Sequence, residues 1–388
     1  MSTTAQAAEA TIAVVDGCLV TPEAVVEGGV RIEEDRIVDV GDVDADADIV
    51  IDADGHLVLP GLVDLHGDDI EGHLHPRSGA RIDIPLALAS ADRANVAAGI
   101  TTKFHAISFE TDEAADRSPE LAATLTDAIS EATDLLVDHR LHARCEVTQQ
   151  RCVEAVLEVV DNGDADLVSV MSHIPGKGQF QDIDTFREYY ENANDRSAEE
   201  AQEIIDERTE IPTGTIRDRI DRVVERAHAA GAVTASHDDE HPEEVRRLAG
   251  AGVDITEYPI TLETAKAAAE ETMTTAMGAP NLVRGGSQWG NLATAEGIDA
   301  GVVDILVADY HPPSLLASVF VDTGESLPER VARVSANPAD AAGFTDRGRI
   351  EEGKRADLIV VDREPAPTVT NALVSGRPVY HADSGGRR

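Results

Sequence analysis

The central part of the chain alternates short apolar runs with longer stretches of helical character. Each run ends in polar residues, and a helix-like stretch follows it. The runs cover residues 57–65, 99–107, 140–147, 165–171, 232–236, 253–258, 274–279 and 302–308. Alternating strand and helix patterns are typical of a parallel sheet. Eight such units in about 290 residues fit a closed barrel better than an open sheet, so the predicted fold is an α/β, (β/α)8 TIM barrel.

The two ends of the chain carry a different pattern, with short β-branched runs separated by turn residues. These runs cover residues 11–15, 25–32 and 36–40 at one end and 348–353, 356–361 and 369–379 at the other. Asp-Gly and Gly-Gly pairs between such runs indicate turns. We therefore expect a small β-sandwich domain built from both termini, residues 1–59 and 346–388, and a barrel domain at 60–345.

Two segments of the predicted barrel look inserted. Residues 110–138 are acidic and mostly helical in pattern, and residues 182–221 are long, charged and helical, with Pro212 and Gly214 as breakers. Both follow strand ends, where a barrel places its functional loops. For most of their length, solvated acidic helices are the better explanation.

The charge of the chain indicates in which kind of cell it works and which partners it can bind. Among 388 residues there are 74 acidic and 32 basic ones, which gives a net charge of −42, and only four lysines occur. Such a surface repels itself in dilute buffer and is screened at molar salt, which favours a cytoplasmic protein of a halophile over an ordinary acidic enzyme. Nucleic acid is excluded as an expected partner because binding it needs a basic surface. We expect no membrane span or secretory signal, and three cysteines fit a reducing compartment.

Candidate chemistry begins at the end of the first run, in the segment Asp64-Leu-His66-Gly67-Asp68. On a strand, residues i and i+2 point to the same face, so His66 and Asp68 are expected side by side. Imidazole and carboxylate together suit Zn²⁺, Mn²⁺ or Fe²⁺ better than Ca²⁺. The pair alone is a weak indication of a metal site.

Four further residues of the same kinds follow later runs: Glu146, His173, His237 and Asp309. Barrel active sites lie at the carboxyl ends of the strands, so these side chains are expected to meet His66 and Asp68. Any one of them alone could cap a strand or a helix. Their joint placement predicts a metal centre, with enough ligands for two divalent ions.

Several segments resemble the amidohydrolase superfamily. They are Pro60-Gly-Leu-Val-Asp-Leu-His66, Ala308-Asp309 and the tail segment at residues 348–361. The usual opening of that superfamily is His-x-His, whereas this chain has His66-Gly-Asp68, which argues against the dihydroorotase-like and urease-like branches. Members often form dimers, so the resemblance makes a homodimer an expectation.

Four blocks resemble more closely a branch of this superfamily that acts in phosphonate catabolism: residues 139–146, 236–239, 277–287 and 309–312. The resemblance implies metal-dependent hydrolysis of α-D-ribose 1-methylphosphonate 5-triphosphate to the 5-phosphate and diphosphate, through a metal-activated water. It also implies that Glu146 bridges two ions and that Asp309 contacts one of them and accepts the proton of the water. The alternatives are hydrolysis of a cyclic amide and, in another class, a non-enzymatic assembly protein.

Binding a triphosphate requires cations inside an acidic protein. Arg284 is the first candidate, because guanidinium groups pair with phosphate and Gly285-Gly286-Ser287 behind it offers backbone N–H groups to an anion. Arg77 and Lys177 are the next candidates for binding the substrate. A surface ion pair is the alternative for each of them. Asp238 or Asp239 could orient His237; a solvated helix start before Pro242 explains both residues equally well.

Overall fold

The computed structural model describes residues 10–77, 79–112, 116–174, 197–288 and 290–383. They form two compact units. Unit 1 comprises Met1–Lys103, Thr133–His139 and Ile305–Arg388, and unit 2 comprises Phe104–Ala132 and Arg140–Asp304. The boundaries of these two units differ from the predicted domain boundaries, which stay a prediction. No helix among the described residues has both the length and the apolar character needed to cross a membrane.

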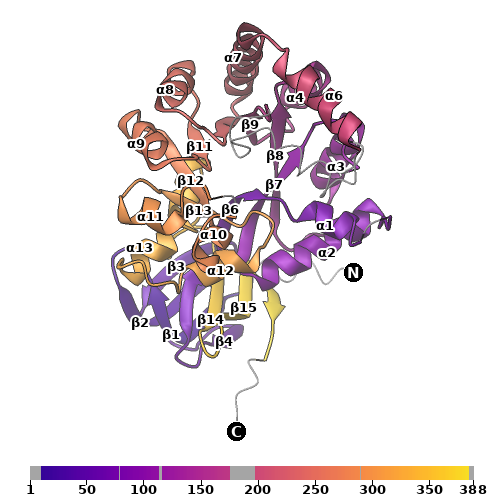
Figure 1. Ribbon diagram of the computed structural model, residues 1–388. Coiled ribbons are helices and arrows are strands. Elements are labelled where there is room, and N and C mark those ends of the chain that lie inside the picture. Colours follow the sequence, from indigo (N-terminus) through magenta and orange to yellow (C-terminus); the bar gives the residue numbers. More distant parts are fainter. Residues whose placement is uncertain (1–9, 78, 113–115, 175–196, 289, 384–388) are drawn as a thin grey trace. The chain divides into compact units, whose positions relative to one another are not determined.

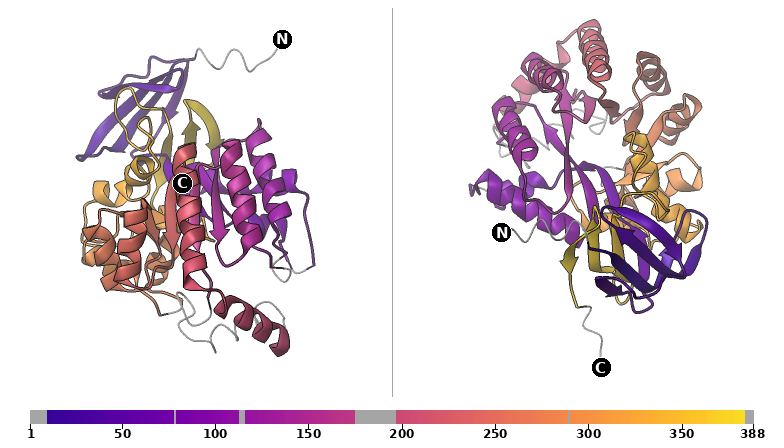
Figure 2. Two further views of the ribbon diagram at one scale, coloured as in Figure 1. Left: turned by 90° about the horizontal axis from the view of Figure 1, so that it is seen from above. Right: turned by 180° about the vertical axis from the view of Figure 1, so that it is seen from behind.

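The two ends of the chain together build a separate β-structure in unit 1, as predicted, and its strands form one sheet. Its strands are β1 (Ile12–Val20), β2 (Val25–Glu33), β3 (Arg36–Gly41), β4 (Ile49–Asp52), β5 (Leu57–Pro60), β14 (Leu358–Asp362), β15 (Thr368–Val374) and β16 (Arg377–His381). Their order is β16-β15-β14-β5-β1-β2-β3, and β4 pairs with β1. The indigo and yellow strands lie side by side in Figure 2 because β5 pairs antiparallel with β14. β4 was not predicted, and residues 348–353 form no strand.

A second sheet contains the eight predicted barrel strands. They are β6 (Leu62–Gly67), β7 (Ile100–Ser108), β8 (Asp138–Glu146), β9 (Leu167–Met171), β10 (Val233–His237), β11 (Ile255–Glu257), β12 (Thr274–Gly278) and β13 (Ile305–Val307). Their order, β13-β12-β11-β10-β9-β8-β7-β6, follows the chain. In unit 1, a parallel bridge between Gly67 and Asp309 also joins β6 to the segment after β13. This topology confirms the predicted (β/α)8 barrel.

The first apolar run is divided between the two sheets at Gly61. A Cβ atom on this residue would overlap the Thr101 side chain on β7. Glycine therefore allows the close approach at which the chain leaves β5 for β6.

Helices follow the barrel strands (Figure 1). Unit 1 contains α1 (Ile70–Leu74), α2 (Ile84–Ala97), α12 (Pro313–Ser318), α13 (Leu327–Ala332) and α14 (Ala336–Ala341). Unit 2 contains α3 (Pro119–Glu131), α4 (Gln150–Asn162), α6 (Ala198–Thr209), α7 (Thr213–Ala230), α8 (Pro242–Ala251), α9 (Leu262–Glu270), α10 (Ala279–Arg284) and α11 (Thr294–Asp299). α7 packs against β9 and β10 through a buried stripe that includes Ile216, Ile220 and Val223. This spacing of three and four residues is that of one helix face.

Both inserted segments contribute helices among the described residues. The first contains α3, and the second contributes α6 and the start of α7. Residues 113–115 and 182–196 lie outside the described part. Pro212 precedes α7 and acts as its N-cap residue, as a helix breaker should. Gly214 does not break the helix, because it lies in the first turn of α7, where the backbone N–H groups have no partner within the helix.

Candidate functional site

In unit 1, the structure brings three of the predicted ligands together at the ends of β6 and β13. The N–H of Asp68 donates to the carbonyl of Asp309 at 2.8 Å, and the N–H of Asp309 donates to the carbonyl of His66 at 2.8 Å. His66 is buried, and Asp68 and Asp309 are half-buried. Asp309 has a φ of 55°, in the left-handed region, which aspartate tolerates better than most residues.

A buried lysine lies beside this turn. Lys103 Nζ is 2.8 Å from Asp64 Oδ2 and 2.7 Å from Asp69 Oδ1, and its side chain is fully buried. Burial alone would lower the pKa of Lys103, but the two carboxylates outweigh it and raise that pKa above its usual value. Gly67 leaves the room for this side chain, because a Cβ there would overlap Nζ and Cε of Lys103. The sequence analysis did not identify Lys103.

In unit 2, two predicted ligands contact each other. His173 Nδ1 lies 2.8 Å from Oε2 of Glu146, which is at the end of β8. The other carboxylate oxygen of Glu146 accepts hydrogen bonds from the backbone N–H and the hydroxyl of Thr148, at 3.1 and 2.5 Å. One ligand atom each of Glu110, Glu146 and His173 lie within 4.8 Å of one another, so this group could hold a metal ion.

The surroundings of Glu146 keep it ionised. Burial opposes the charge, but His173, Arg208 and Thr148 together lower the pKa of Glu146 to about 2. Arg208, on α6, also donates to the carbonyl of His173 at 2.9 Å. A carboxylate that is charged throughout the neutral range is the form that binds a cation.

His237, at the end of β10, is oriented by its neighbour. Its Nδ1 lies 2.9 Å from Asp238 Oδ2, as expected for a positioning carboxylate. Burial disfavours both charges, yet their mutual attraction outweighs it, raising the pKa of His237 and lowering that of Asp238. Asp239 serves another purpose: it accepts hydrogen bonds from Ser236 and Thr256, and burial raises its pKa to about 6.

Glu257 is a buried carboxylate that the sequence analysis missed. It ends β11, and its Oε2 lies 3.7 Å from His142 Nε2. Burial raises its pKa, although His142, His237 and Arg144 act in the opposite direction. Its place at the end of the run 253–258 was the available indication, since every other candidate ligand also follows such a run.

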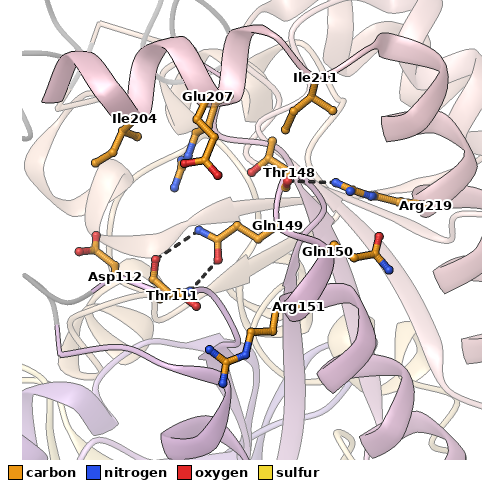
Figure 3. Close-up of a pocket in the computed structure, with 11 residues that line it drawn as sticks. Thr111, Asp112, Thr148, Gln149, Gln150, Arg151, Ile204, Glu207, Ile211 and Arg219 are labelled. Atoms are coloured by element: carbon orange, nitrogen blue, oxygen red, sulfur yellow. Dashed lines mark hydrogen bonds between the residues drawn. The ribbon is translucent and has the colours of Figure 1, made fainter. Parts of the chain in front are cut away.

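Unit 2 contains a cavity of about 600 Å³ (Figure 3). It adjoins the group around Glu146, because Thr148 and Arg208, which line it, hydrogen-bond Glu146 and His173. Thr148, Gln149 and Thr111 line it, and the amide of Gln149 hydrogen-bonds the backbone of Thr111. Three arginines and two carboxylates also line it: Arg151, Arg208, Arg219, Asp112 and Glu207. Arg219 donates to the carbonyls of Val147 and Thr148, and Arg208 to that of His173, so both hold the loops after strand ends.

The predicted substrate-binding residues stay predictions. Arg284 ends α10 and is exposed, and its guanidinium donates to the carbonyl of Gly286. The N–H groups of Gly285 and Gly286 donate to carbonyls of α10, so these glycines end the helix. The hydroxyl of Ser287 accepts from the N–H of Asn291. Arg77 is exposed in unit 1, and Lys177 lies outside the described residues.

Comparison with known proteins agrees with the fold described above. A family model described as the amidohydrolase family matches residues 155–380. The chain belongs to the amidohydrolase family. An Escherichia coli (strain K12) relative of this amidohydrolase, named alpha-D-ribose 1-methylphosphonate 5-triphosphate diphosphatase, is 34% identical over an alignment of 357 residues. The match covers 89% of this chain and 94% of the relative.

Solved structures show the same fold. The structure described as molinate hydrolase has a TM-score of 0.66 at 16% identity and covers 95% of this chain and 94% of that chain. A dihydropyrimidinase from Brevibacillus agri has a TM-score of 0.64 at 15% identity and covers 96% of this chain and 95% of its own. At such identities the likeness concerns the fold alone.

Amidohydrolases generally depend on metal ions, and the side chains of this one suit such ions. Glu110, Glu146 and His173 combine carboxylate oxygen and imidazole nitrogen in a small buried volume. This donor set suits Zn²⁺, Mn²⁺ and Fe²⁺. In addition, Asp238 on His237 supplies the supporting carboxylate that metal-binding histidines usually have.

Proposed function

We propose that this amidohydrolase hydrolyses α-D-ribose 1-methylphosphonate 5-triphosphate to the 5-phosphate and diphosphate. The relative of that name, whose match extends over nearly the whole chain, supports the substrate. The observation that carries the proposal is the carboxylate and histidine group around Glu146, which adjoins a cavity lined by three arginines. Such a combination suits hydrolysis of an anionic phosphate ester or anhydride.

The proposed metal ligands form two sets. In unit 1 they are His66, Asp68 and Asp309, and in unit 2 they are Glu146, His173 and His237. A bound divalent ion, Zn²⁺ first and Mn²⁺ or Fe²⁺ otherwise, would lower the pKa of water from about 15.7 towards 7 and supply a nucleophile at neutral pH. Two ions are proposed, since six ligands are available.

The side chains of the protein would then place and move the proton. Asp309 is the proposed acceptor for the proton of the attacking water, because it is a half-buried carboxylate at a strand end. Asp238 holds the ring of His237, and Thr148 and Arg208 keep Glu146 ionised. A water oxygen bonds to phosphorus, the phosphoanhydride bond breaks, and diphosphate departs with the electron pair.

Cations must hold the phosphates against the overall charge of −42. Arg284, Arg77 and Lys177 remain the proposed contacts, with Gly285 and Ser287 beside the first of them. Arg208, one of the arginines that line the cavity in unit 2, adds positive charge near Glu146. Molar salt would screen the long-range repulsion between protein and substrate, and short contacts inside the site would be screened less.

The test is release of diphosphate from the ribosyl phosphonate triphosphate at high salt, with metal analysis of the same sample. We expect Arg284→Ala to raise KM for the triphosphate, because Arg284 is proposed to bind the phosphates in the ground state. Arg222→Ala is the matched control, because Arg222 is an exposed arginine of the same unit on α7. Turnover of a cyclic amide with no diphosphate release would contradict the proposal and favour the alternative activity.

The remaining features of the proposed enzyme follow from composition and family. We propose that it works in the cytoplasm of a halophile, because the acidic surface needs high salt and the three cysteines are free. We propose a homodimer because members of the superfamily often form dimers. Gel filtration with light scattering at high salt tests that state.

A further inference from the structure

Lys103 is a charged residue that the proposed reaction does not use. It is one of four lysines in the chain, it lies on β7, and its side chain is fully buried. A buried ammonium is costly unless it is paired, and this one is paired twice. Asp64 precedes the segment His66-Gly67-Asp68, and Asp69 follows it, so the ammonium joins both ends of the proposed ligand turn.

Asp64 extends this contact to the second ligand-bearing strand. While its Oδ2 faces Lys103, its Oδ1 accepts from the N–H of Ala308 at 2.9 Å and from the N–H of His66 at 3.2 Å. Ala308 directly precedes Asp309. One carboxylate therefore holds the backbone next to two proposed ligands, on β6 and after β13.

Asp69 is held from a third direction. Its Oδ2 accepts from Asn95 Nδ2 on α2 at 2.9 Å, and the same amide group donates to the carbonyl of Ala91. The Lys103 ammonium thus connects β7, the turn after β6 and α2. Both carboxylates are almost completely buried, so water screens these contacts little.

We propose that Lys103 is a positioning residue: through Asp64 and Asp69 it fixes the backbone that carries His66, Asp68 and Asp309, so that these side chains bind a divalent metal ion. The inference rests on the proposed function, because that function assigns these three residues as ligands. Groups that orient metal ligands commonly contribute about 10- to 100-fold to metal affinity. Lys103 would act in this way without touching the metal.

The test is a titration of metal-free protein with Co²⁺ at constant high salt. Calorimetry measures the affinity, and the visible absorption of the bound Co²⁺ reports on its ligands. His66→Ala identifies the part of the binding that depends on the ligands of unit 1. We expect Lys103→Met to weaken that same part about 10- to 100-fold and to change its absorption bands. Asp69→Asn, which leaves the pair of Lys103 with Asp64 in place, should have a smaller effect in the same direction.

Arg347→Met is the matched control. Arg347 is also a buried cation of unit 1 with two carboxylate partners, Asp138 at 2.5 Å and Asp346 at 2.9 Å. It contacts Thr102, whose side chain points to the opposite face of β7 from Lys103. We expect Arg347→Met to lower thermal stability but to leave the His66-dependent Co²⁺ affinity unchanged.

Several outcomes would overturn the inference. They are unchanged Co²⁺ affinity in Lys103→Met, an equal loss in Arg347→Met, tighter binding once the ammonium is removed, and a His66→Ala variant that binds Co²⁺ like the wild type. If Lys103→Met does not fold, Asp69→Asn decides by the same comparison. The proposed function fails separately, namely if the wild type shows His66-dependent Co²⁺ binding but releases no diphosphate.

Discussion

Replacing Gly67 by alanine should destabilise the protein strongly, although the change adds only one methyl group. The new Cβ would overlap Nζ and Cε of Lys103 and lie 2.7 Å from Asp64 Oδ2. The backbone at Gly67 cannot retreat easily, because it is bridged to Asp309 and flanked by hydrogen bonds on both sides. The ammonium would therefore have to move away from its two carboxylates.

The magnitude follows from that displacement. With an effective dielectric constant near 20, moving one charge pair from about 2.8 to about 4.5 Å costs roughly 2 kcal/mol. Two carboxylates are affected, and crowding of a packed interior adds about 1–3 kcal/mol. The two pairs together account for about 4 kcal/mol, so we expect a loss of about 5–7 kcal/mol in the free energy of unfolding, somewhat more than the cost of breaking one buried ion pair.

The assay is urea-induced unfolding at constant molar salt, compared by midpoint and slope. Gly72→Ala is the control, because no described atom lies within 4 Å of a Cβ added there. Lys103→Val removes the group that the new methyl would strike, so Gly67→Ala should cost about 4 kcal/mol less in that background, the part that depends on the two ion pairs. The reasoning is refuted if Gly67→Ala unfolds like the wild type, or if its cost is the same with and without Lys103.

Three further predictions concern other parts of the molecule. Glu146→Gln should lose the metal held by the ligands of unit 2 and with it diphosphate release, whereas the exposed Glu154→Gln should keep both; metal analysis and turnover measure this, and an unchanged metal content in Glu146→Gln would contradict it. Asp92→Asn should lower the free energy of unfolding by about 1–3 kcal/mol, since buried Asp92 accepts backbone N–H groups of the 136–137 segment. Ser326 donates to the Glu329 carboxylate and holds the pKa of Glu329 below its usual 4.5. Part of the stability lost in Ser326→Ala should therefore be present above pH 4.5 and disappear as the pH falls through the lowered pKa, whereas the part due to the N-cap hydrogen bond from the Glu329 N–H should remain. A pH-independent difference between the melting temperatures of the wild type and the variant would contradict this.

The periodicity of the sequence was enough to predict the barrel, because burial on both faces leaves each strand as an apolar run. The eight runs correspond to β6–β13, and the terminal runs to a sheet shared by both ends. β4 was not predicted because its four residues are mostly exposed and do not alternate between buried and exposed positions. The prediction that Gly214 breaks the helix was wrong, because a glycine in the first turn interrupts no hydrogen bond within the helix.

Residues whose role depends on a distant partner could not be predicted. Lys103 lies inside an apolar run, and its carboxylate partner Asp64 is 39 residues away, so nothing local explains a charge there. By contrast, the contact of His237 with Asp238 was within reach, because the two are adjacent in the sequence. The interpretation of Gly285 and Gly286 as an anion-binding loop stays a prediction. The structure adds a second role that the same residue pattern often has, because these glycines also end α10.

The close approach of Lys103 to Gly67 also constrains how this chain can have diverged from its ancestors. A side chain cannot be gained at position 67 while the lysine remains, and losing the lysine leaves a gap next to the glycine. The two positions should therefore vary together among homologous sequences. Wherever position 67 carries a β-carbon, position 103 should hold a shorter, uncharged residue that packs against it.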